Sequence, residues 1–310
     1  MKIINIYKPK GWTSFDVVSF LKKKFNEKKV GHLGTLDPLA TGVLPVFMGK
    51  ATKLIPYFNN TDKTYRTICK LGVSTDTYDS EGIVTNINFS TKISRAIVSK
   101  YLKNFVGQRE QKIPPFSAAK IKGIPYYKLA RKGLKTPKVS RNVFFYELRI
   151  EKIELPYVQY VVKCSKGTYI RSMVNEWGIL LKVGAYLTAL ERLACGNFFN
   201  TKNSISIDNL NDIQKFSDIP WISPSNLLNH LNTINADDEI LSCIKFGKRV
   251  KLSASKICID FKTFEKDKVF EQTSERMQTK VLDINQNLIA IGNLLWEDNI
   301  CYFQPSKVFI

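Results

Sequence analysis

Alternating apolar and polar residues mark three segments of this chain as β-strands with one buried face. The alternation runs over 65–71, 144–150 and 158–164, and we expect the last two segments to pair in one sheet. The residues expected to point inward from the middle segment are Phe144, Tyr146, Leu148 and Ile150. Over 170–177 the apolar residues instead recur every three or four positions, which predicts a helix with one face in the core.

Local signals mark the two ends of the chain. Thr13 and Asp16 form a capping box, which predicts the start of an N-terminal helix. Residues 201–223 are polar and lack a period, as expected of a linker, and a short helix is predicted around 227–231. Five short strands separated by turns follow, at 249–252, 256–261, 280–284, 288–295 and 300–303. Strands spaced in this way are typical of a small β-barrel.

These patterns together predict an α+β protein. Its main part would be a mixed, largely antiparallel sheet flanked by helices, and its C-terminal part the small β-barrel. A chain of 310 residues suits about two domains. We expect the first to span 1–223 and the second to span 224–310.

The net charge of +20 indicates a polyanionic partner, of which nucleic acid is the first candidate. A general bias toward lysine would mix the signs of charge over the surface. Between Gln111 and Tyr146, however, nine Lys and Arg residues occur without a single Asp or Glu. We interpret residues 109–142, which also contain several prolines, as a basic excursion from the sheet.

Several classes of protein are disfavoured by what the sequence lacks. No segment is apolar enough to span a membrane, and the N-terminus lacks the core of a signal peptide, so we expect a cytoplasmic protein with no membrane partner. The six cysteines form no Cys-x-x-Cys pair, and only His32 and His230 could assist them, so no metal site is expected. No phosphate-binding glycine loop or dinucleotide fingerprint is present, so no cofactor is expected.

Chemistry is most strongly indicated by the run 31–45, GHLGTLDPLATGVLP. It holds a single carboxylate, Asp37, between glycines and prolines that restrict the backbone on both sides. Such a loop can present a side chain in a fixed geometry. The alternative is structural, because an Asp before Pro38 is also a common cap of a helix or turn. The spacing alone favours neither interpretation.

Four segments in the same order resemble the bacterial tRNA pseudouridine-55 synthases of the TruB family. They are the Asp37 run, DKTYR at 62–66, LGVSTDT at 71–77 and SKGTYIR at 165–171. The resemblance implies the pseudouridine synthase fold, with the basic excursion acting as a thumb and the C-terminal part as a PUA-like RNA-binding module. It implies an isomerase that flips out a uridine in the T-loop of tRNA, at position 55, and converts it to pseudouridine without a cofactor.

Three residues are the expected catalytic group. Asp37 matches the family's catalytic carboxylate, and Tyr65 matches its active-site tyrosine, although a strand tyrosine by itself is more often core. Arg171 is expected in the first turn of a helix, where a cation requires an acidic partner. A guanidinium can hold a carboxylate with two parallel hydrogen bonds, so we expect Arg171 to pair with Asp37. The alternative is a surface arginine that contacts phosphate.

Six further residues are expected to contact the RNA substrate; they are His32, Tyr169, Leu193, Lys63, Lys120 and Lys122. For Leu193, the sequence favours packing in the core over a contact with the substrate. One departure from the family pattern lies beside His32, because Leu33 is larger than the residue usual there.

The expected partner is the T-arm stem-loop of tRNA, bound by a monomer that requires no protein partner. Two alternatives stay open. One is a guide-RNA-dependent relative that modifies ribosomal RNA, and the other is a tRNA-binding or tRNA-folding protein without activity.

Overall fold

The computed structural model describes most of the chain. It covers residues 1–88, 93–117, 119–121, 123–131, 134, 139–253, 257–258, 277–297 and 300–310, with residues 120, 121, 125, 127, 128, 131, 257 and 258 described for their backbone alone. No helix within these residues is long and apolar enough to cross a membrane.

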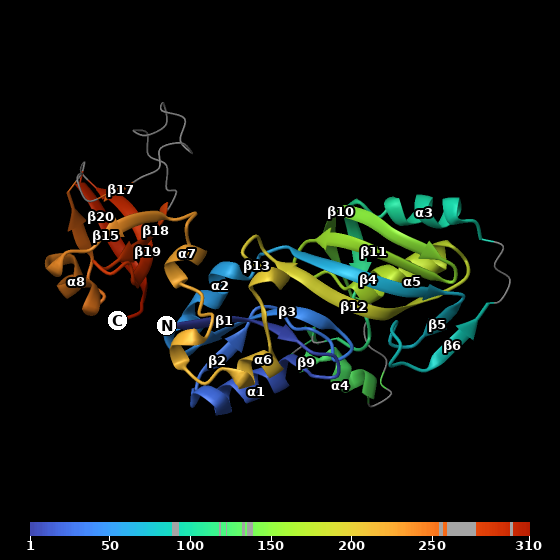
Figure 1. The fold of residues 1–310 in the computed structure, drawn as a ribbon. Helices are drawn as coiled ribbons and strands as arrows, with labels where there is room; N and C mark the ends of the chain where they lie inside the picture. Colours follow the sequence, from blue (N-terminus) through green and yellow to red (C-terminus); the bar gives the residue numbers. More distant parts are fainter. Residues whose placement is uncertain are drawn as a thin grey trace.

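A large mixed sheet forms the main body of the protein (Figure 1). Its strands, in order across the sheet, are β14 (Ile205–Ser206), β1 (Lys2–Lys8), β3 (Thr41–Met48), β12 (Ala185–Cys195), β4 (Lys63–Leu71), β11 (Tyr157–Cys164), β10 (Ser140–Glu154) and β7 (Gly107–Lys112). Two short strands join its side, β2 (Val30–His32) on β3 and β13 (Phe199–Asn200) on β12. Among the described strand pairs of this sheet, only β1–β14 and β3–β12 are parallel. The expected α+β class with a largely antiparallel sheet is confirmed.

Four helices contribute to one apolar core with this sheet. They are α1 (Ser14–Phe25), α3 (Arg95–Lys103), α5 (Ile170–Leu180) and α6 (Ile207–Asp212). The predicted capping box at the start of α1 is present, with Thr13 and Asp16 bonded reciprocally. Trp177 of α5 is fully buried and packs edge-on against Tyr160 of β11. The helix predicted over 170–177 and the strand alternation over 65–71 are therefore confirmed.

The predicted inward face of β10 is wrong for its first half. Phe144 and Tyr146 remain 39% and 41% exposed, whereas Val143 and Phe145 are buried. A register shift between Phe145 and Glu147 inserts one extra residue into the strand, and this bulge reverses the alternation. Period-two counting assumes an uninterrupted ladder, so it cannot anticipate the change.

The basic excursion leaves the sheet after β7 and returns at β10. These two strands pair antiparallel, with Lys112 opposite Ser140. Between them lie the hairpin of β8 (Lys120–Ile121) and β9 (Ile124–Pro125) and the short helix α4 (Tyr126–Arg131). Figure 1 shows the excursion on the same side of the sheet as α1.

The expected linker at 201–223 is instead part of the main body. Within it, β14 pairs with β1, and Ile207 and Leu210 of α6 are buried in the core. The short helix α7 (Pro224–Leu227) begins earlier than predicted. Because polar residues separate these few apolar contacts, the segment shows no apolar period in the sequence.

A second, curled sheet forms the C-terminal part (Figure 1). In order, its strands are β16 (Val250–Leu252), β20 (Ile300–Val308), β19 (Leu288–Glu297), β18 (Met277–Leu282), β15 (Asn232–Asn235) and β17 (Ile257–Cys258). All five predicted strands have a counterpart, although residues 256 and 259–261 of the second lie outside the described residues. The prediction missed β15 and helix α8 (Asp238–Lys245).

The two sheets are joined through an apolar cluster on the reverse side of β1 and β3. Ile3 points into this cluster, while its neighbour Ile4 points into the main core, as strand alternation requires. Leu288 and Phe309 approach from the C-terminal sheet, and α7 contributes Leu227. The remaining short elements are η1 (Gly49–Leu54), α2 (Ile55–Phe58), η2 (Thr201–Asn203), η3 (Phe216–Asp218) and the hairpin of β5 (Val73–Thr75) and β6 (Val84–Ile87).

Candidate active site

Asp37 lies in the connection between β2 and β3, and the backbone of this loop is fixed by neighbours. The amide of Ala40 donates to the Asp37 carbonyl at 3.0 Å, which closes a turn. The amide of Gly11 donates to the Pro38 carbonyl at 2.8 Å, and the amide of Leu36 donates to the hydroxyl of the first residue of α1 at 2.8 Å. A turn is thus present, but the Asp37 carboxylate is directed elsewhere.

Two glycines allow the loop to follow this path. Gly34 and Gly42 have φ values of +78° and +101°, which side-chain-bearing residues rarely adopt. A Cβ added at Gly42 would also lie 2.3 Å from the Arg192 carbonyl oxygen of β12. The loop and β12 can therefore come this close only because residue 42 has no side chain.

The Asp37 carboxylate forms a two-point ion pair with Arg171, as expected from the sequence. Arg171 Nε donates to Asp37 Oδ2 at 2.9 Å, and Nη2 donates to Oδ1 at 3.3 Å. The remaining guanidinium hydrogens face the carbonyl oxygens of Thr77 at 3.0 Å and Phe116 at 2.7 Å and the Asp79 carboxylate at 3.4 Å. Four N–H groups of this buried guanidinium therefore donate hydrogen bonds, and the Asp79 carboxylate lies within ion-pair distance of Nη1.

Asp79 is the second acidic partner of Arg171. It is buried, and its Oδ1 accepts from the Thr77 hydroxyl at 2.6 Å and from the Glu81 amide at 3.1 Å. These bonds fix the carboxylate against the guanidinium. Arg171 is consequently held from the side opposite Asp37, whose own side chain stays 37% exposed.

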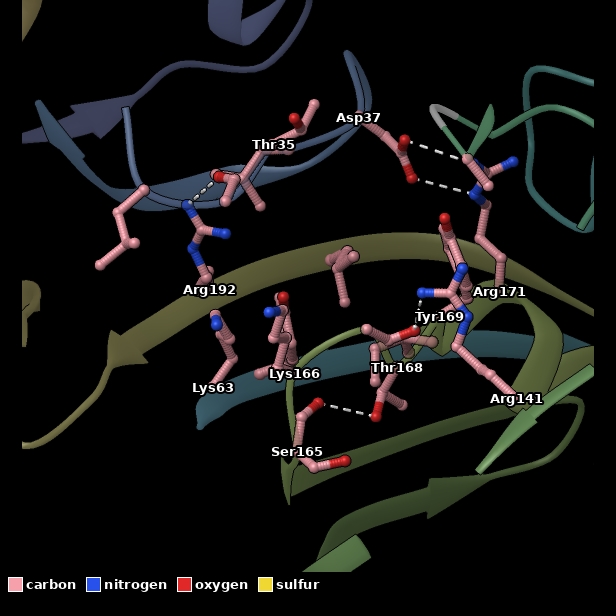
Figure 2. Close-up of a pocket in the computed structure, with 18 of the residues that line it drawn as sticks. Thr35, Asp37, Lys63, Arg141, Ser165, Lys166, Thr168, Tyr169, Arg171 and Arg192 are labelled. Carbon is pink, nitrogen blue, oxygen red and sulfur yellow. Dashed lines mark hydrogen bonds and ion pairs between the residues drawn. The ribbon is translucent and has the colours of Figure 1, made fainter. Parts of the chain in front are cut away.

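Asp37 and Arg171 form part of the wall of a cavity of about 360 Å³ (Figure 2). Its charged lining residues are Asp37, Lys63, Arg141, Lys166, Arg171 and Arg192. Figure 2 shows Lys63 and Arg192 across the cavity from the Asp37–Arg171 pair. The cavity has one carboxylate and an excess of cations, which suits a ligand that carries or develops negative charge.

Tyr65 and Lys63 are adjacent inward-facing residues of β4 and both line the cavity. Burial raises the pKa of the Tyr65 phenol to about 12, although the neighbouring Arg192 opposes the increase. Tyr65 is therefore protonated near neutral pH. Burial lowers the pKa of the Lys63 ammonium, whose Nζ donates to the Thr61 carbonyl.

Tyr169 and Arg141 form one edge of the cavity. Tyr169 caps α5, and both its amide and its carbonyl are bonded to the side-chain amide of Gln111. The Arg141 guanidinium lies over the Tyr169 ring, 5.3 Å from its centroid. A cation over a ring restricts both side chains while leaving their edges for a ligand.

Two predicted contact residues do not line the cavity. His32 is half-buried in β2, and burial lowers the pKa of its imidazole. Leu193 is the extra residue at a register shift in β12, and the side chains that line the cavity from this strand are Leu190 and Arg192. The contact of Leu193 with RNA stays a prediction.

The other predicted residues lie at the limits of the described chain. Lys120 is in β8, but its side chain and all of Lys122 lie outside the described residues. Leu33, the departure from the family pattern, lines the cavity and is buried in the cluster between the sheets. Its larger side chain is accommodated there by apolar neighbours.

Sequence reasoning missed Asp79, Arg192 and Arg141 as site residues. Asp79 follows the LGVSTDT segment by two residues, and Arg192 directly precedes Leu193. Both are therefore close in sequence to predicted site segments. Charged residues inside otherwise apolar strands, such as Arg192 in β12, were the available signal.

Comparison with protein families places most of the site segments in one known family. Residues 22–170 match the model of the TruB family pseudouridylate synthase, N-terminal domain. A relative called tRNA pseudouridine synthase B from Clostridium tetani is 43% identical, over 80% of this chain and 85% of its own. A protein of the same name from Clostridium acetobutylicum is 38% identical, over 94% and 95%.

Solved structures agree with this at the level of fold. The structure of a Cbf5-Nop10-Gar1 complex contains a chain with a TM-score of 0.70 and 23% identity, matched over 100% of this chain and 85% of its own. An H/ACA RNP bound to a substrate RNA gives a TM-score of 0.69 at 22% identity, with the same coverage. At such identity the likeness shows the fold alone.

Proposed function

The chain belongs to the TruB family of pseudouridine synthases, and we propose that it isomerises a uridine of tRNA to pseudouridine. We propose position 55 of the T-loop as its target. The observation that carries the proposal is the two-point ion pair of Arg171 with Asp37 at the wall of a cavity. Relatives that carry the name tRNA pseudouridine synthase B support the substrate.

In this proposal Asp37 is the catalytic carboxylate. Isomerisation breaks the bond between N1 of uracil and C1′ of ribose and rejoins the base through C5, with no net oxidation. A carboxylate can attack the sugar carbon as the bond opens. The second acidic partner, Asp79, allows Arg171 to orient Asp37 without fully neutralising the site.

The remaining cavity residues would recognise the flipped nucleotide. Tyr65 supplies an aromatic face for the base, and Tyr169 an adjacent one. Arg141 and Lys166, which are less buried than Lys63, would contact phosphate.

We propose further that residues 1–223 form the catalytic part and 224–310 a PUA-like RNA-binding part. The basic excursion of about 109–142 would close on the T-arm, because it carries positive charge and its residue Phe116 already contacts Arg171. In this proposal the protein acts in the cytoplasm as a monomer on tRNA alone.

Incubation of the purified protein with an unmodified tRNA transcript tests the proposal. We expect one pseudouridine, mapped to position 55, in full tRNA and in an isolated T-arm. The Asp37→Asn variant should bind the transcript with unchanged affinity and form no product, since the amide keeps the shape and loses the nucleophile. Product at a rate near that of the unchanged protein would remove Asp37 from the mechanism.

The same assay separates the alternatives. A tRNA-binding protein without activity would bind the transcript and leave uridine unchanged. A guide-RNA-dependent enzyme would act on neither transcript until a guide RNA and its protein partners were added.

A further inference from the structure

The cations of the cavity are not balanced by the carboxylates around it. Arg171 faces two carboxylates, Asp37 and Asp79. In the part of the chain that the structure describes, no carboxylate forms an ion pair with Lys63 or Arg192. Buried charges usually have such a partner, so these two cations require an explanation.

Arg192 is the more unusual of the two, because it is only 1% exposed. Its Nε donates to the Val43 carbonyl at 2.6 Å, and its Nη2 donates to the Gly34 carbonyl at 3.0 Å. These oxygens lie on either side of Asp37 in the sequence, so one guanidinium ties both ends of the loop that carries it. Neutral carbonyls satisfy the donors but leave the positive charge uncompensated.

Lys63 lies beside this guanidinium. Arg192 is among the groups that lower the pKa of its ammonium, after burial itself. Both side chains lie against Gly34 of the Asp37 loop. A Cβ built on Gly34 would be 3.7 Å from Lys63 Cε and 3.3 Å from Arg192 Nη1. Two like charges are thus held together at one wall, across the cavity from Asp37 (Figure 2).

The proposed reaction moves negative charge away from Asp37 and onto the uracil base. When the N1–C1′ bond breaks, both bonding electrons go to the base, which becomes a uracil anion. The Asp37 carboxylate supplies the electron pair of the new bond to C1′ and loses its own charge. In the second step C5 bonds to C1′, Asp37 leaves as a carboxylate, and the C5 proton is released while N1 takes up a proton from solvent.

We propose that Arg192, assisted by Lys63, stabilises the negative charge that develops on the departing uracil, and that Arg192 also positions the Asp37 loop. The inference rests on the proposed function and assigns a role that Arg171 cannot fill, since Arg171 is already matched by two carboxylates. A preorganised charge in a site that excludes water acts strongly on the transition state, even without a direct hydrogen bond. Arg192 lines the cavity but is only 1% exposed, and its hydrogen bonds go to the Asp37 loop, so it acts as a positioning and electrostatic residue.

A change of leaving group distinguishes this role from a purely structural one. T-arm transcripts carrying uridine or 5-fluorouridine at the target position would be compared in single-turnover cleavage of the N1–C1′ bond. Fluorine withdraws electrons and stabilises the base anion, so the fluorinated substrate depends less on the protein's cations. For Arg192→Gln we expect a loss of kcat of about 10²-fold on uridine, with KM little changed, and a loss about tenfold smaller on 5-fluorouridine.

Two further variants sharpen the test. Arg192→Lys retains the charge but not the two carbonyl bonds, so it should recover most of the rate lost in Arg192→Gln. Arg149→Gln is the matched control, because Arg149 is an exposed arginine of β10 and should leave both rates unchanged. Thermal unfolding of each variant establishes that the fold is retained.

Equal losses on the two substrates, or a lysine variant no faster than the glutamine variant, would overturn the inference. Either outcome leaves the proposed function intact, since the unchanged protein still forms pseudouridine. A protein that converts no uridine at all would overturn the proposed function and this inference with it.

Discussion

Arg171→Lys is the substitution that most directly tests the architecture of the site. It keeps the positive charge between Asp37 and Asp79 but replaces a planar fork with a single ammonium. Arg171 donates four hydrogen bonds, whereas a lysine ammonium has three N–H groups. At least one acceptor around residue 171 would therefore lose its donor.

The cost can be estimated from the positions of these acceptors. A buried acceptor without a donor costs about 1–3 kcal/mol, which is the loss expected for one such acceptor. Water can reach Asp37, whose side chain is 37% exposed, which favours the lower end of that range. A domain with a stability of about 5–15 kcal/mol remains folded after such a loss. The effect on the rate should be larger, because displacement of a reacting group by about 1 Å can cost about 10²-fold.

Two measurements check this prediction. Release of tritium from C5 of labelled tRNA gives kcat, which we expect to fall about 10²-fold at unchanged affinity for the T-arm. Chemical denaturation gives the loss of stability. Arg66→Lys is the matched control, since Arg66 also bridges two carboxylates, Glu151 and Glu191, but is 40% exposed and does not line the cavity. If Arg171→Lys retained kcat within about threefold of the unchanged protein, the fork would have no catalytic role.

Three further predictions follow from the same geometry. Asp79→Asn should lower kcat about tenfold without changing T-arm affinity, because Arg171 would then be oriented from one side only; an unchanged single-turnover rate would contradict this. Arg141→Gln should weaken T-arm binding and reduce the slope of log K against log salt by about one, as measured by a salt titration of binding, and an unchanged slope would exclude a phosphate contact. Burial lowers the pKa of the Lys8 ammonium to about 8, below its value of 10.5 in the unfolded chain. The unfolded state therefore binds more protons between these pH values, so the unfolding free energy of the protein should rise with pH across that window relative to Lys8→Met, and parallel curves would contradict it.

Local sequence patterns predicted the elements that are regular. The alternation over 65–71 and the helical period over 170–177 each describe an uninterrupted ladder with one buried face, and both are present. The pairing of Arg171 with Asp37 could also be anticipated, because a cation at a helix N-terminus requires an acid and the Asp37 loop offered one without another task.

What could not be predicted depends on contacts between distant segments. A bulge after Phe145 reversed the exposure of Tyr146, and Leu190 and Arg192, rather than Leu193, line the cavity from β12. Arg192 belongs to the site because β12 lies beside the Asp37 loop, where its guanidinium donates to the Gly34 carbonyl. Such positions follow from strand register across the sheet, on which a single segment carries no information.

The residues of the cavity wall are synthesised far apart in time, and this affects the nascent chain. The Asp37 loop emerges early, yet the guanidinium that orients it follows 134 residues later, and the β12 strand that closes the site later still. A nascent chain meanwhile exposes its basic excursion, which in the proposed function attracts RNA before the active site is formed. We therefore predict that a chain truncated before residue 192 retains affinity for RNA and forms no pseudouridine.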